Sequence, residues 1–341
     1  MKKIIFTLSS LMALQSADAQ DIHFSQFNEN PMHLNPAYTG MFDGLFRVHL
    51  NYRSQWQSMG NPYTTVAGAF DFPLMYSTDR AYMAIGGFFF QDKAGDSNYG
   101  TFQGLGSVSG IVPLNDYNKL SVGIQGGYAQ RSATTAALTW ESQYVNGTFD
   151  PLAPSNEGNL LTSLPYLDFG AGISYQYRSV AGNIMGKDVI ELNFGGSVFH
   201  LNKPVQNFQS GIERLDMRFV IHSSARLDAP GTRWSFRPSG YYMQQGPIAR
   251  EIVIGGLARL RIKHGTKITN FFSEQGLGLG VHYRFGDAII PQVYYDLGDF
   301  FLGFTYDVNI SKYSAMSKYN GGFEITIRYA NLHGAWYKNK R

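Results

Sequence analysis

The sequence contains no cysteine and few charged residues. Without cysteine the chain can form no disulfide, no thiolate nucleophile, no cysteine-ligated zinc site and no lipoprotein anchor. Charged residues make up 16% of the 341 residues, against about 25% in an average soluble domain. The formal net charge of +3 is small and scattered. A nucleic-acid-binding surface is therefore not expected.

Long apolar runs are also missing after the first 19 residues. No later segment approaches the roughly 18 consecutive apolar residues that indicate a transmembrane helix. Glycine and aromatic residues are abundant instead, with 38 Gly, 22 Tyr and 25 Phe. Few charges and many aromatics without an apolar helix favour a membrane β-barrel, because only alternate residues of each strand then face lipid.

The first residues have the pattern of an export signal. Lys2 and Lys3 give a positive start, residues 4–14 are apolar, and Ala17-Asp18-Ala19 supplies small residues for cleavage. An apolar run of this length is too short to cross a bilayer core of about 30 Å as a helix. We therefore expect residues 1–19 to be a cleaved signal peptide and the mature chain to begin at Gln20.

Alternation of apolar and polar residues predicts the strands. It is clearest near 167–178, 277–285 and 322–329, where the second face carries Gly, Ser, Asn or Gln rather than the Lys and Glu of a soluble sandwich. Fourteen strands are predicted, near 44–53, 63–72, 81–91, 102–112, 119–131, 166–178, 189–200, 214–227, 233–243, 250–260, 276–285, 288–297, 299–309 and 320–330.

This pattern predicts an all-β, antiparallel outer-membrane barrel over residues 44–330. An even strand number places both ends of the barrel in the periplasm. The longest connection, 132–165, then lies outside the cell, and the turns at 113–116 and 228–231 lie in the periplasm. The gap at 261–275 is long for a periplasmic turn, so the count could change by two. Residues 331–341 are expected to form a short basic periplasmic tail.

Residues 20–43 do not alternate. The steps Asn30-Pro31 and Asn35-Pro36 impose turns or extended backbone. Irregular backbone at membrane depth is tolerated only where protein buries it or water lines it. We expect this segment to be ordered and to pack at or in the periplasmic mouth of the barrel.

The same segment resembles the start of the PorP/SprF family of the Bacteroidetes type IX secretion apparatus. Its sequence QDIHFSQFNENPMHLNPAYTG is similar to the family pattern QDPxFSQY…NPLYLNPAxAG, with Ile22 in place of Pro and Phe27 in place of Tyr. Two further stretches are similar, NYR-QW at 51–56 and GFTYDVNIS at 303–311 followed by GGFEI at 321–325. The residues that carry the resemblance include Phe24, Ser25, Gln26, Asn30, Pro31, Asn35, Pro36, Tyr306, Asp307 and Asn309.

The resemblance implies an outer-membrane component associated with type IX secretion. Family members serve export or cell-surface retention of large adhesins that carry a C-terminal secretion domain, usually of type B, in gliding motility or adhesion. The implied partners are such an adhesin and other components of the secretion system. Composition and periodicity support only the barrel.

Alternation also places many charged side chains in the lumen, with more basic than acidic members. They are Arg47, His49, Arg53, Asp168, Arg178, Glu191, Arg218, Arg226, Arg284, Glu324 and Arg328. Buried charges must pair or meet water, so one interpretation is a set of internal ion pairs. The other is that Arg178, Arg284 and Arg328 bind carboxylates of the partner, because guanidinium forks suit that task.

The long connection offers a second candidate partner site. A structureless connection of about 34 residues is unusual and suggests a function. Trp140, Tyr144 and Phe149 are the aromatic type that dominates protein interfaces. We hypothesise that the C-terminal region of the partner docks here and at the interior arginines.

No pattern indicates an enzyme, a cofactor or a metal. His222 and Ser224 could share a strand face, but nothing orients them as base and nucleophile. Asp307, Asn309 and Ser311 have the spacing at which a calcium loop begins, but the later glycine and glutamate are missing. The alternative to secretion is a plugged fourteen-stranded transporter for small or hydrophobic solutes, which would need a continuous path or a lateral opening.

Overall fold

The computed structural model describes residues 21–331 except 58–59, 76, 78, 96, 134–137, 146, 155–162, 184–185, 207–213, 264–273 and 313, and only the backbone of 181–183 and 186–187. The expected signal peptide and all but the first residue of the basic tail lie outside these residues. No helix among the described residues is long and apolar enough to cross a membrane.

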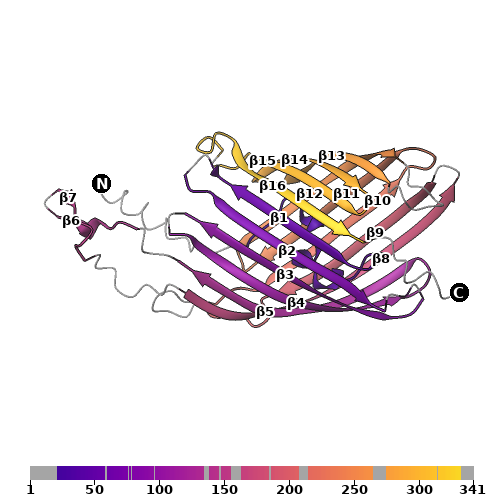
Figure 1. Cartoon of the computed structure of the whole chain (residues 1–341), viewed down its shortest axis with the longest axis horizontal. Helices are drawn as coiled ribbons and strands as arrows, with labels where there is room; N and C mark the ends of the chain where they lie inside the picture. The colour runs from indigo at the N-terminus through magenta and orange to yellow at the C-terminus, as the bar shows by residue number, and fades with distance from the viewer. Residues whose placement is uncertain are drawn as a thin grey trace, which may run out of the picture.

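Fourteen of the described strands close into one antiparallel barrel, as predicted (Figure 1). The barrel strands are β1 (Arg47–Gln55), β2 (Tyr63–Leu74), β3 (Tyr82–Ala94), β4 (Tyr99–Pro113), β5 (Asn118–Ser132), β8 (Ser163–Asn183), β9 (Gly186–Phe199), β10 (Arg218–Asp228), β11 (Trp234–Gln245), β12 (Ala249–Lys263), β13 (Gln275–Arg284), β14 (Ala288–Leu297), β15 (Phe300–Asn309) and β16 (Asn320–Ala330). The barrel closes where β1 pairs with β16, with Arg53 opposite Glu324.

The two ends of the barrel differ. The connections 133–162, 200–217 and 310–319 leave one end, which we call the loop end. The opposite end, the turn end, holds the start of β1 and the end of β16, together with tight turns such as the one at Gly298, whose φ is +69°. Long loops face outward and short turns face the periplasm in bacterial barrels, so we expect the loop end to be the extracellular one.

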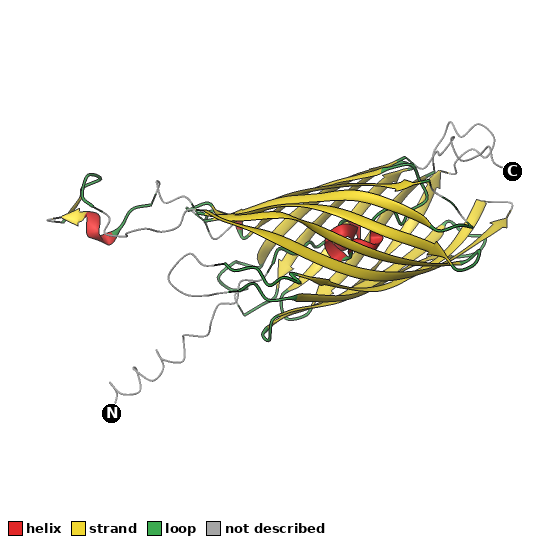
Figure 2. Cartoon of the chain, turned by 90° about the horizontal axis from the view of Figure 1, so that it is seen from below, coloured by secondary structure: helices red, strands yellow, loops and turns green. Residues whose placement is uncertain are grey.

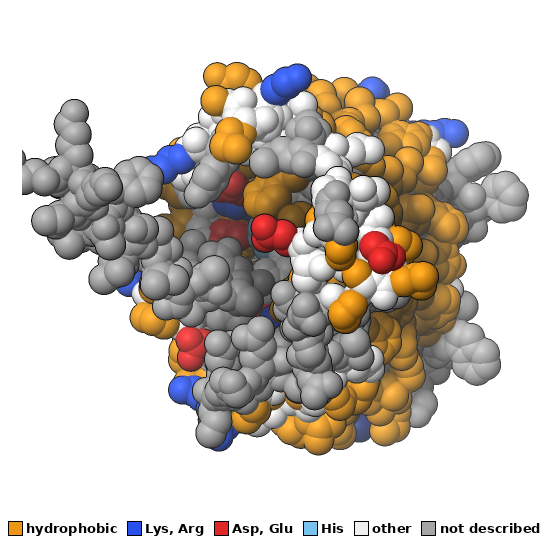
Figure 3. Space-filling model, turned by 90° about the vertical axis from the view of Figure 1, so that its left-hand side faces the viewer, with side chains coloured by type: hydrophobic (Ala, Val, Ile, Leu, Met, Phe, Trp, Pro, Cys, Tyr) orange, Lys and Arg blue, Asp and Glu red, His pale blue; other side chains and the backbone are white. Residues whose placement is uncertain are grey.

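The outer wall is apolar and the inner wall is polar. Leu167 and Ile173 of β8 are about half exposed, while Asp168 and Ser174, the residues that follow them, are buried. Large exposed hydrophobic side chains recur on every barrel strand, far beyond the patches that a soluble monomer exposes. Figure 3 looks into the loop end and shows acidic and basic side chains within the opening and hydrophobic ones on the outer surface.

Strand ends are the main difference from the prediction. β8 runs five residues past its predicted end at 178, to Asn183, and pairs there with β9. Ala181, Gly182 and Asn183 have low strand propensity, but the backbone pairing of the hairpin keeps them in the sheet. β10 begins at Arg218 rather than 214, because Arg214 forms only an isolated bridge with Val205.

The long connection at the loop end carries structure that the sequence did not predict. A short helix, η4 (Glu141–Gln143), leads into β6 (Tyr144–Val145) and β7 (Thr148–Phe149), which pair as a small hairpin (Figures 1 and 2). The rings of Tyr144 and Phe149 lie 5.6 Å apart across it.

Residues 21–43, which we call the plug, lie inside the barrel. They form η1 (Phe27–Glu29), α2 (Pro31–Leu34) and η2 (Pro36–Tyr38), seen within the ring of strands in Figure 2. The prediction that this segment is ordered and packs in the barrel is confirmed. It extends beyond the periplasmic mouth, because Asp21 contacts His200 at the loop end and Asp43 contacts Arg178 towards the turn end.

Candidate functional site

The path of the plug is set by its two Asn-Pro steps. Pro31 and Pro36 each occupy a first helical position, where the missing N–H of proline costs nothing. The Asn35 side chain accepts a hydrogen bond from Ala37 N at 2.9 Å and caps η2. Each turn is short, so the plug folds back repeatedly instead of crossing the lumen as one helix.

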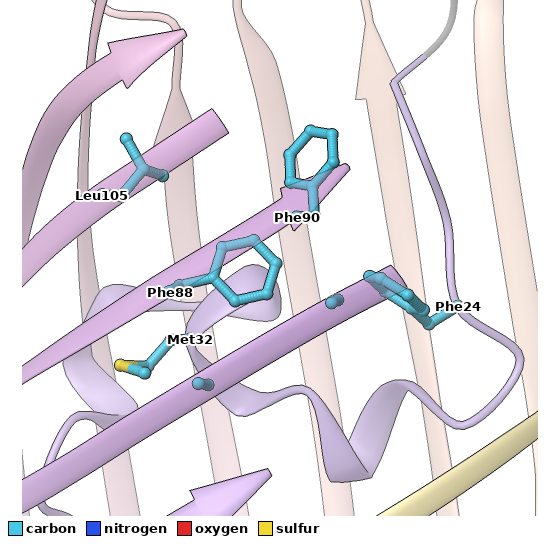
Figure 4. Close-up of a cluster of buried hydrophobic side chains, with 7 residues drawn as sticks. Phe24, Met32, Phe88, Phe90 and Leu105 are labelled. Carbon is cyan, nitrogen blue, oxygen red and sulfur yellow. The ribbon is translucent and has the colours of Figure 1, made fainter. Parts of the chain in front are cut away.

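Apolar side chains fix the plug to opposite sides of the wall. On one side Phe24 and Met32 pack among Phe88, Phe90 and Leu105, shown in Figure 4. On the other side Phe27 and Leu34 pack with a second group formed by Phe199, Val220, Tyr241 and Val253. Burial of a phenylalanine side chain contributes about 1.5–3 kcal/mol, so these contacts hold the plug firmly.

A buried polar network joins the plug to the strands that close the barrel. We call it the seam network, and its members are Ser25, Gln26, Arg53, Arg284, Asp307 and Glu324. The backbone N–H groups of Ser25 and Gln26 donate to the Glu324 carboxylate at 2.7 and 3.0 Å. Ser25 Oγ donates to Asp307 Oδ1 at 2.6 Å. One carboxylate from β16 and one from β15 therefore hold adjacent plug residues.

The charges of the seam network balance. Arg53 contacts Asp307 at 2.8 Å and Glu324 at 3.2 Å, and Arg284 contacts Asp307 at 3.1 Å. The four charged side chains are at most 3% exposed. Bonds between ionised partners are the strongest hydrogen bonds in proteins, and removing one partner leaves an unpaired buried charge. The network thus ties β1, β13, β15 and β16 to the plug.

Hydroxyl groups on the inner wall satisfy the backbone of the plug. Ser197 Oγ donates to Leu34 O, Ser121 Oγ to Ala37 O and Ser109 Oγ to Thr39 O, at 2.6 to 2.7 Å. Buried carbonyls need such partners. The serines that alternation assigned to the lumen therefore have a specific task. They donate hydrogen bonds to the carbonyl groups of an irregular segment that is not paired with a neighbouring strand.

The first described residue of the plug is held by a charged group at the loop end. His200 Nε2 contacts Asp21 at 2.5 Å and its Nδ1 contacts Asp168 at 2.9 Å, while Arg218 lies 3.3 Å from Asp21. Burial opposes the charged form of His200, but the charge of Asp21 and hydrogen bonds to both carboxylates raise its pKa to about 9. Burial likewise opposes ionisation of Asp21, yet His200 and Arg218 hold its pKa well below the usual range.

His33 shows the opposite effect deeper in the lumen. Burial, reinforced by the charge of Arg218, lowers its pKa to about 3. Its Nε2 lies 3.1 Å from Ile22 O, within hydrogen-bond distance. His33 is therefore neutral at physiological pH and takes part in packing.

Comparison with known proteins decides the family. A family model described as type IX secretion system membrane protein PorP/SprF matches residues 16–329, nearly the whole chain. The chain belongs to the PorP/SprF family. The resemblance seen in the sequence is confirmed, and a closed barrel with an apolar outer wall places this family member in the outer membrane.

Solved barrels are similar in shape only. TodX, a monoaromatic hydrocarbon channel, has 7% sequence identity and a TM-score of 0.48, covering 88% of this chain and 94% of that one. BamA from Haemophilus ducreyi has 11% identity and a TM-score of 0.42, covering 84% and 70%. The transport unit of the autotransporter AIDA-I from Escherichia coli has 10% identity and a TM-score of 0.40, covering 89% and 97%. No curated protein matches the chain.

The PorP/SprF motifs come together although they lie at opposite ends of the sequence. Ser25 and Gln26 of the first motif meet Arg53 of the second, and Asp307 and Glu324 of the third. Asn35 bonds to Ile173 O at 2.9 Å and lies 2.9 Å from His222 Nε2, which gives that histidine a structural contact. The motifs therefore position the plug inside the barrel.

Other motif residues act more locally. Phe24 is fully buried against β2 and β3, and the Asn30 side chain donates to Gln26 O at 3.4 Å. Tyr306 OH donates to Asn320 at 2.8 Å. Asn309 donates to Ser317 at 3.0 Å and accepts from Ser311 N. No group of potential metal ligands occurs in the described part of the chain.

The three candidate arginines do not form one cluster. Arg284 lies at the loop end and contacts Asp287 and Asp307. Arg178 and Arg328 lie towards the turn end, where Arg178 contacts Asp43 and Glu191 and Arg328 contacts Glu29 at 2.8 Å. Each arginine already has a carboxylate partner within the chain, which agrees with the internal ion-pair interpretation.

The candidate aromatics of the long connection are accessible. Tyr144 and Phe149 are exposed on the small hairpin, and Trp140 is half-buried beside it. The partner-binding and motif residues named from the sequence did not include Arg53 and Glu324, which belong to the seam network. Alternation had placed both side chains in the lumen, and that was the feature of the sequence that could have identified them.

Proposed function

We propose that this PorP/SprF protein serves export and cell-surface retention of a large adhesin with a type B C-terminal secretion domain, in gliding or adhesion. Other components of the secretion system would act beside it. Family membership supports the secretion role. The observation that favours docking over passage is the plug, which contacts opposite sides of the lumen and is fixed to the wall by the seam network.

The docking surface in this proposal is the loop end. Tyr144 and Phe149 present exposed rings on a hairpin beyond the barrel strands (Figures 1 and 2), and Trp140 lies next to them. Exposed aromatics of this kind anchor protein interfaces. The arginines Arg178, Arg284 and Arg328 contribute less, because internal carboxylates already occupy them.

The alternative, a passive transporter for small or hydrophobic solutes, needs a path through the lumen. The plug blocks an axial path, since its side chains contact the wall on opposite sides. An axial channel would require the plug to leave its site. Secretion therefore remains the preferred function.

Deletion of the gene and replacement with variants tests the proposal. We expect deletion to remove one or a few surface adhesins from the cell while other type IX cargo is still exported. The double variant Tyr144→Ser and Phe149→Ser should reduce adhesin retention by about tenfold, as loss of interface anchors does. Tyr117→Ser is the control, since this exposed tyrosine lies at the turn end. Loss of all type IX cargo would contradict an adhesin-specific role, and normal retention in the double variant would contradict docking at the hairpin.

A further inference from the structure

The strand pairing between β10 and β11 is interrupted. Ser224 pairs with Ser239 and Leu227 pairs with Phe236, but the two positions between them on each strand are unpaired. These positions are Ala225 and Arg226 on β10 and Arg237 and Pro238 on β11. Pro238 has no N–H to donate, so it breaks the ladder inside a strand that has neighbours on both sides. The interruption lies nearer the turn end.

An apolar groove lies over this interruption on the lipid-facing side. Its volume is about 960 Å³, within the range of about 300–1,000 Å³ that holds small molecules. Small residues, Ser223, Ala225 and Gly240 together with Pro238, form its centre. Large side chains surround them, including Leu192, Phe194, Ile221, Tyr242 and Ile254.

A second cavity lies behind the same stretch of wall, between the plug and the inner wall, and extends from β8–β12 to residues of β14, β15, β16 and β1. Its volume is about 310 Å³, and Ser224, Ala225, Pro238 and Ser239 line both it and the outer groove. The charged residues that line it are Glu29, Arg47, Glu191, Arg226, Arg237 and Arg328. Three of the four arginines are paired with carboxylates, Arg47 with Asp71, Arg226 with Asp228 and Arg328 with Glu29.

Arg237 has the weakest internal pairing of these arginines. Its nearest carboxylate is Asp296 at 3.9 Å, and Asp296 already accepts two bonds of 2.7 Å from Arg259. The Nε atom of Arg237 is buried without a hydrogen-bond partner among the described residues, as is that of Arg328, and the Arg237 guanidinium lies 5.4 Å from the centre of the Tyr294 ring. Arg47, Arg226 and Arg328 each hold a carboxylate at 2.7 to 2.9 Å.

We propose that this wall binds a long-chain carboxylate, with the acyl chain in the outer groove and the carboxylate at Arg237. The groove faces the lipid phase, where acyl chains are the available apolar partner. A carboxylate matches the guanidinium of Arg237 in charge and geometry. The carboxylate would pass the wall where the groove and the inner cavity share lining residues, at the two unpaired positions of each strand. The site is independent of the proposed secretion role.

A second proline interruption shows what distinguishes this one. Pro291 also lies between unpaired positions, where β14 faces β15 between Gln292–Thr305 and Ile289–Val308. Behind it Ile290 and Asp307 are fully buried, and Asp307 is occupied by Arg53 and Arg284. The inner side is therefore occupied, and both arginines there contact the Asp307 carboxylate, at 2.8 and 3.1 Å. The break at Pro238, by contrast, has a cavity on each side.

Binding of radiolabelled palmitate to the detergent-solubilised full chain tests the site. We expect saturable binding that Arg237→Gln weakens by at least about tenfold, since a bond to a charged group is lost. Ala225→Trp should abolish it by filling the groove, and Ser223→Phe serves if that variant does not fold. The matched controls are Arg250→Gln, an exposed arginine on β12, and Ala171→Trp, a lipid-facing alanine outside the groove. Both should bind as the unmodified protein does.

Two competitors identify the ligand class. Hexadecanol should bind the groove with an affinity that Arg237→Gln does not change, because it carries no anion. Phosphatidylglycerol should compete poorly. The proposal is overturned if palmitate does not saturate, if the groove and arginine variants bind like their controls, or if phosphatidylglycerol displaces palmitate at lower concentration than palmitate itself.

Discussion

Two buried carboxylates, those of Asp307 and Glu324, bind the plug to the barrel wall. Asp307 receives bonds from Ser25, Arg53 and Arg284, and Glu324 receives two backbone N–H groups and Arg53. Neither side chain is accessible to a partner. Their presence in the family motifs follows from this structural role.

Neutralising Asp307 should release the plug. In Asp307→Asn, Arg53 and Arg284 lose a buried partner, and we expect a loss of about 3–5 kcal/mol in the free energy of unfolding. Urea unfolding measures the loss, and limited proteolysis should show faster cleavage within residues 21–41. Asp116→Asn, in an exposed turn, is the control. Equal stability of the two variants would show that the seam network does not hold the plug.

His200 should make the attachment of Asp21 depend on pH. Because the pKa of His200 is raised from 6.5 to about 9, its contribution is complete below about pH 6.5 and is lost as the pH rises through 9. Because the pKa of Asp21 is lowered from its ordinary value of 3.8, its contribution to stability is present above about pH 3.8 and is lost only in acid. We expect stability to fall by up to about 3 kcal/mol between pH 6 and pH 10, and the fall to disappear in His200→Gln. Urea unfolding midpoints measured across this pH range follow the change in stability. The prediction is wrong if the stability of His200→Gln falls with pH as steeply as that of the unmodified protein.

The plug fits closely against the barrel strands because several positions on the inner wall are glycines, which have no side chain. A Cβ added at Gly123 of β5 would lie 2.5 Å from the carbonyl carbon and oxygen of Pro36. Both are backbone atoms, so relief requires movement of η2. The close approach of plug and wall therefore depends on glycine there.

Gly123→Ala should displace the plug. We expect destabilisation of about 1–3 kcal/mol, as for other overpacked interiors, with faster proteolysis of residues 21–41. Gly110→Ala on β4 is the matched control, because an added Cβ there has nothing within 4 Å, and its effect should stay within about 0.5 kcal/mol. Comparable changes in both variants would mean that the contact at Pro36 is unimportant.

The strands were predictable from sequence for a physical reason. Lipid on one face and a polar lumen on the other force a period of two, and Leu167 to Tyr177 shows it plainly. Alternation fixes the face of a residue but not its height along the barrel or its position around it. That is why Arg178 and Arg284 shared a predicted face yet lie towards opposite ends. The contact of Ser25 with Glu324 spans 299 residues, and no local pattern encodes it.

For the whole molecule, the plug decides whether the barrel conducts. We expect the complete protein to show little conductance in a planar bilayer, because the plug contacts opposite sides of the wall. A variant lacking residues 21–41 should conduct, since it leaves a lumen lined by Arg53, Glu324 and other polar groups. Heat-modifiable migration in gels checks that the shortened barrel is folded. A folded variant that does not conduct would show that other parts of the chain close the lumen.

The seam network also bears on the order of events during assembly. Ser25 and Gln26, near the start of the described chain, touch β15 and β16, which are made last, as well as β1. A barrel that shut first would have to admit Phe24, Phe27 and Met32 past walls that already touch the plug backbone at Gly123. Insertion is far easier while the edges of β1 and β16 are still apart. We therefore expect the N-terminal segment to enter before the last strand pair forms, so that its contacts with Asp307 and Glu324 are made as the cylinder closes.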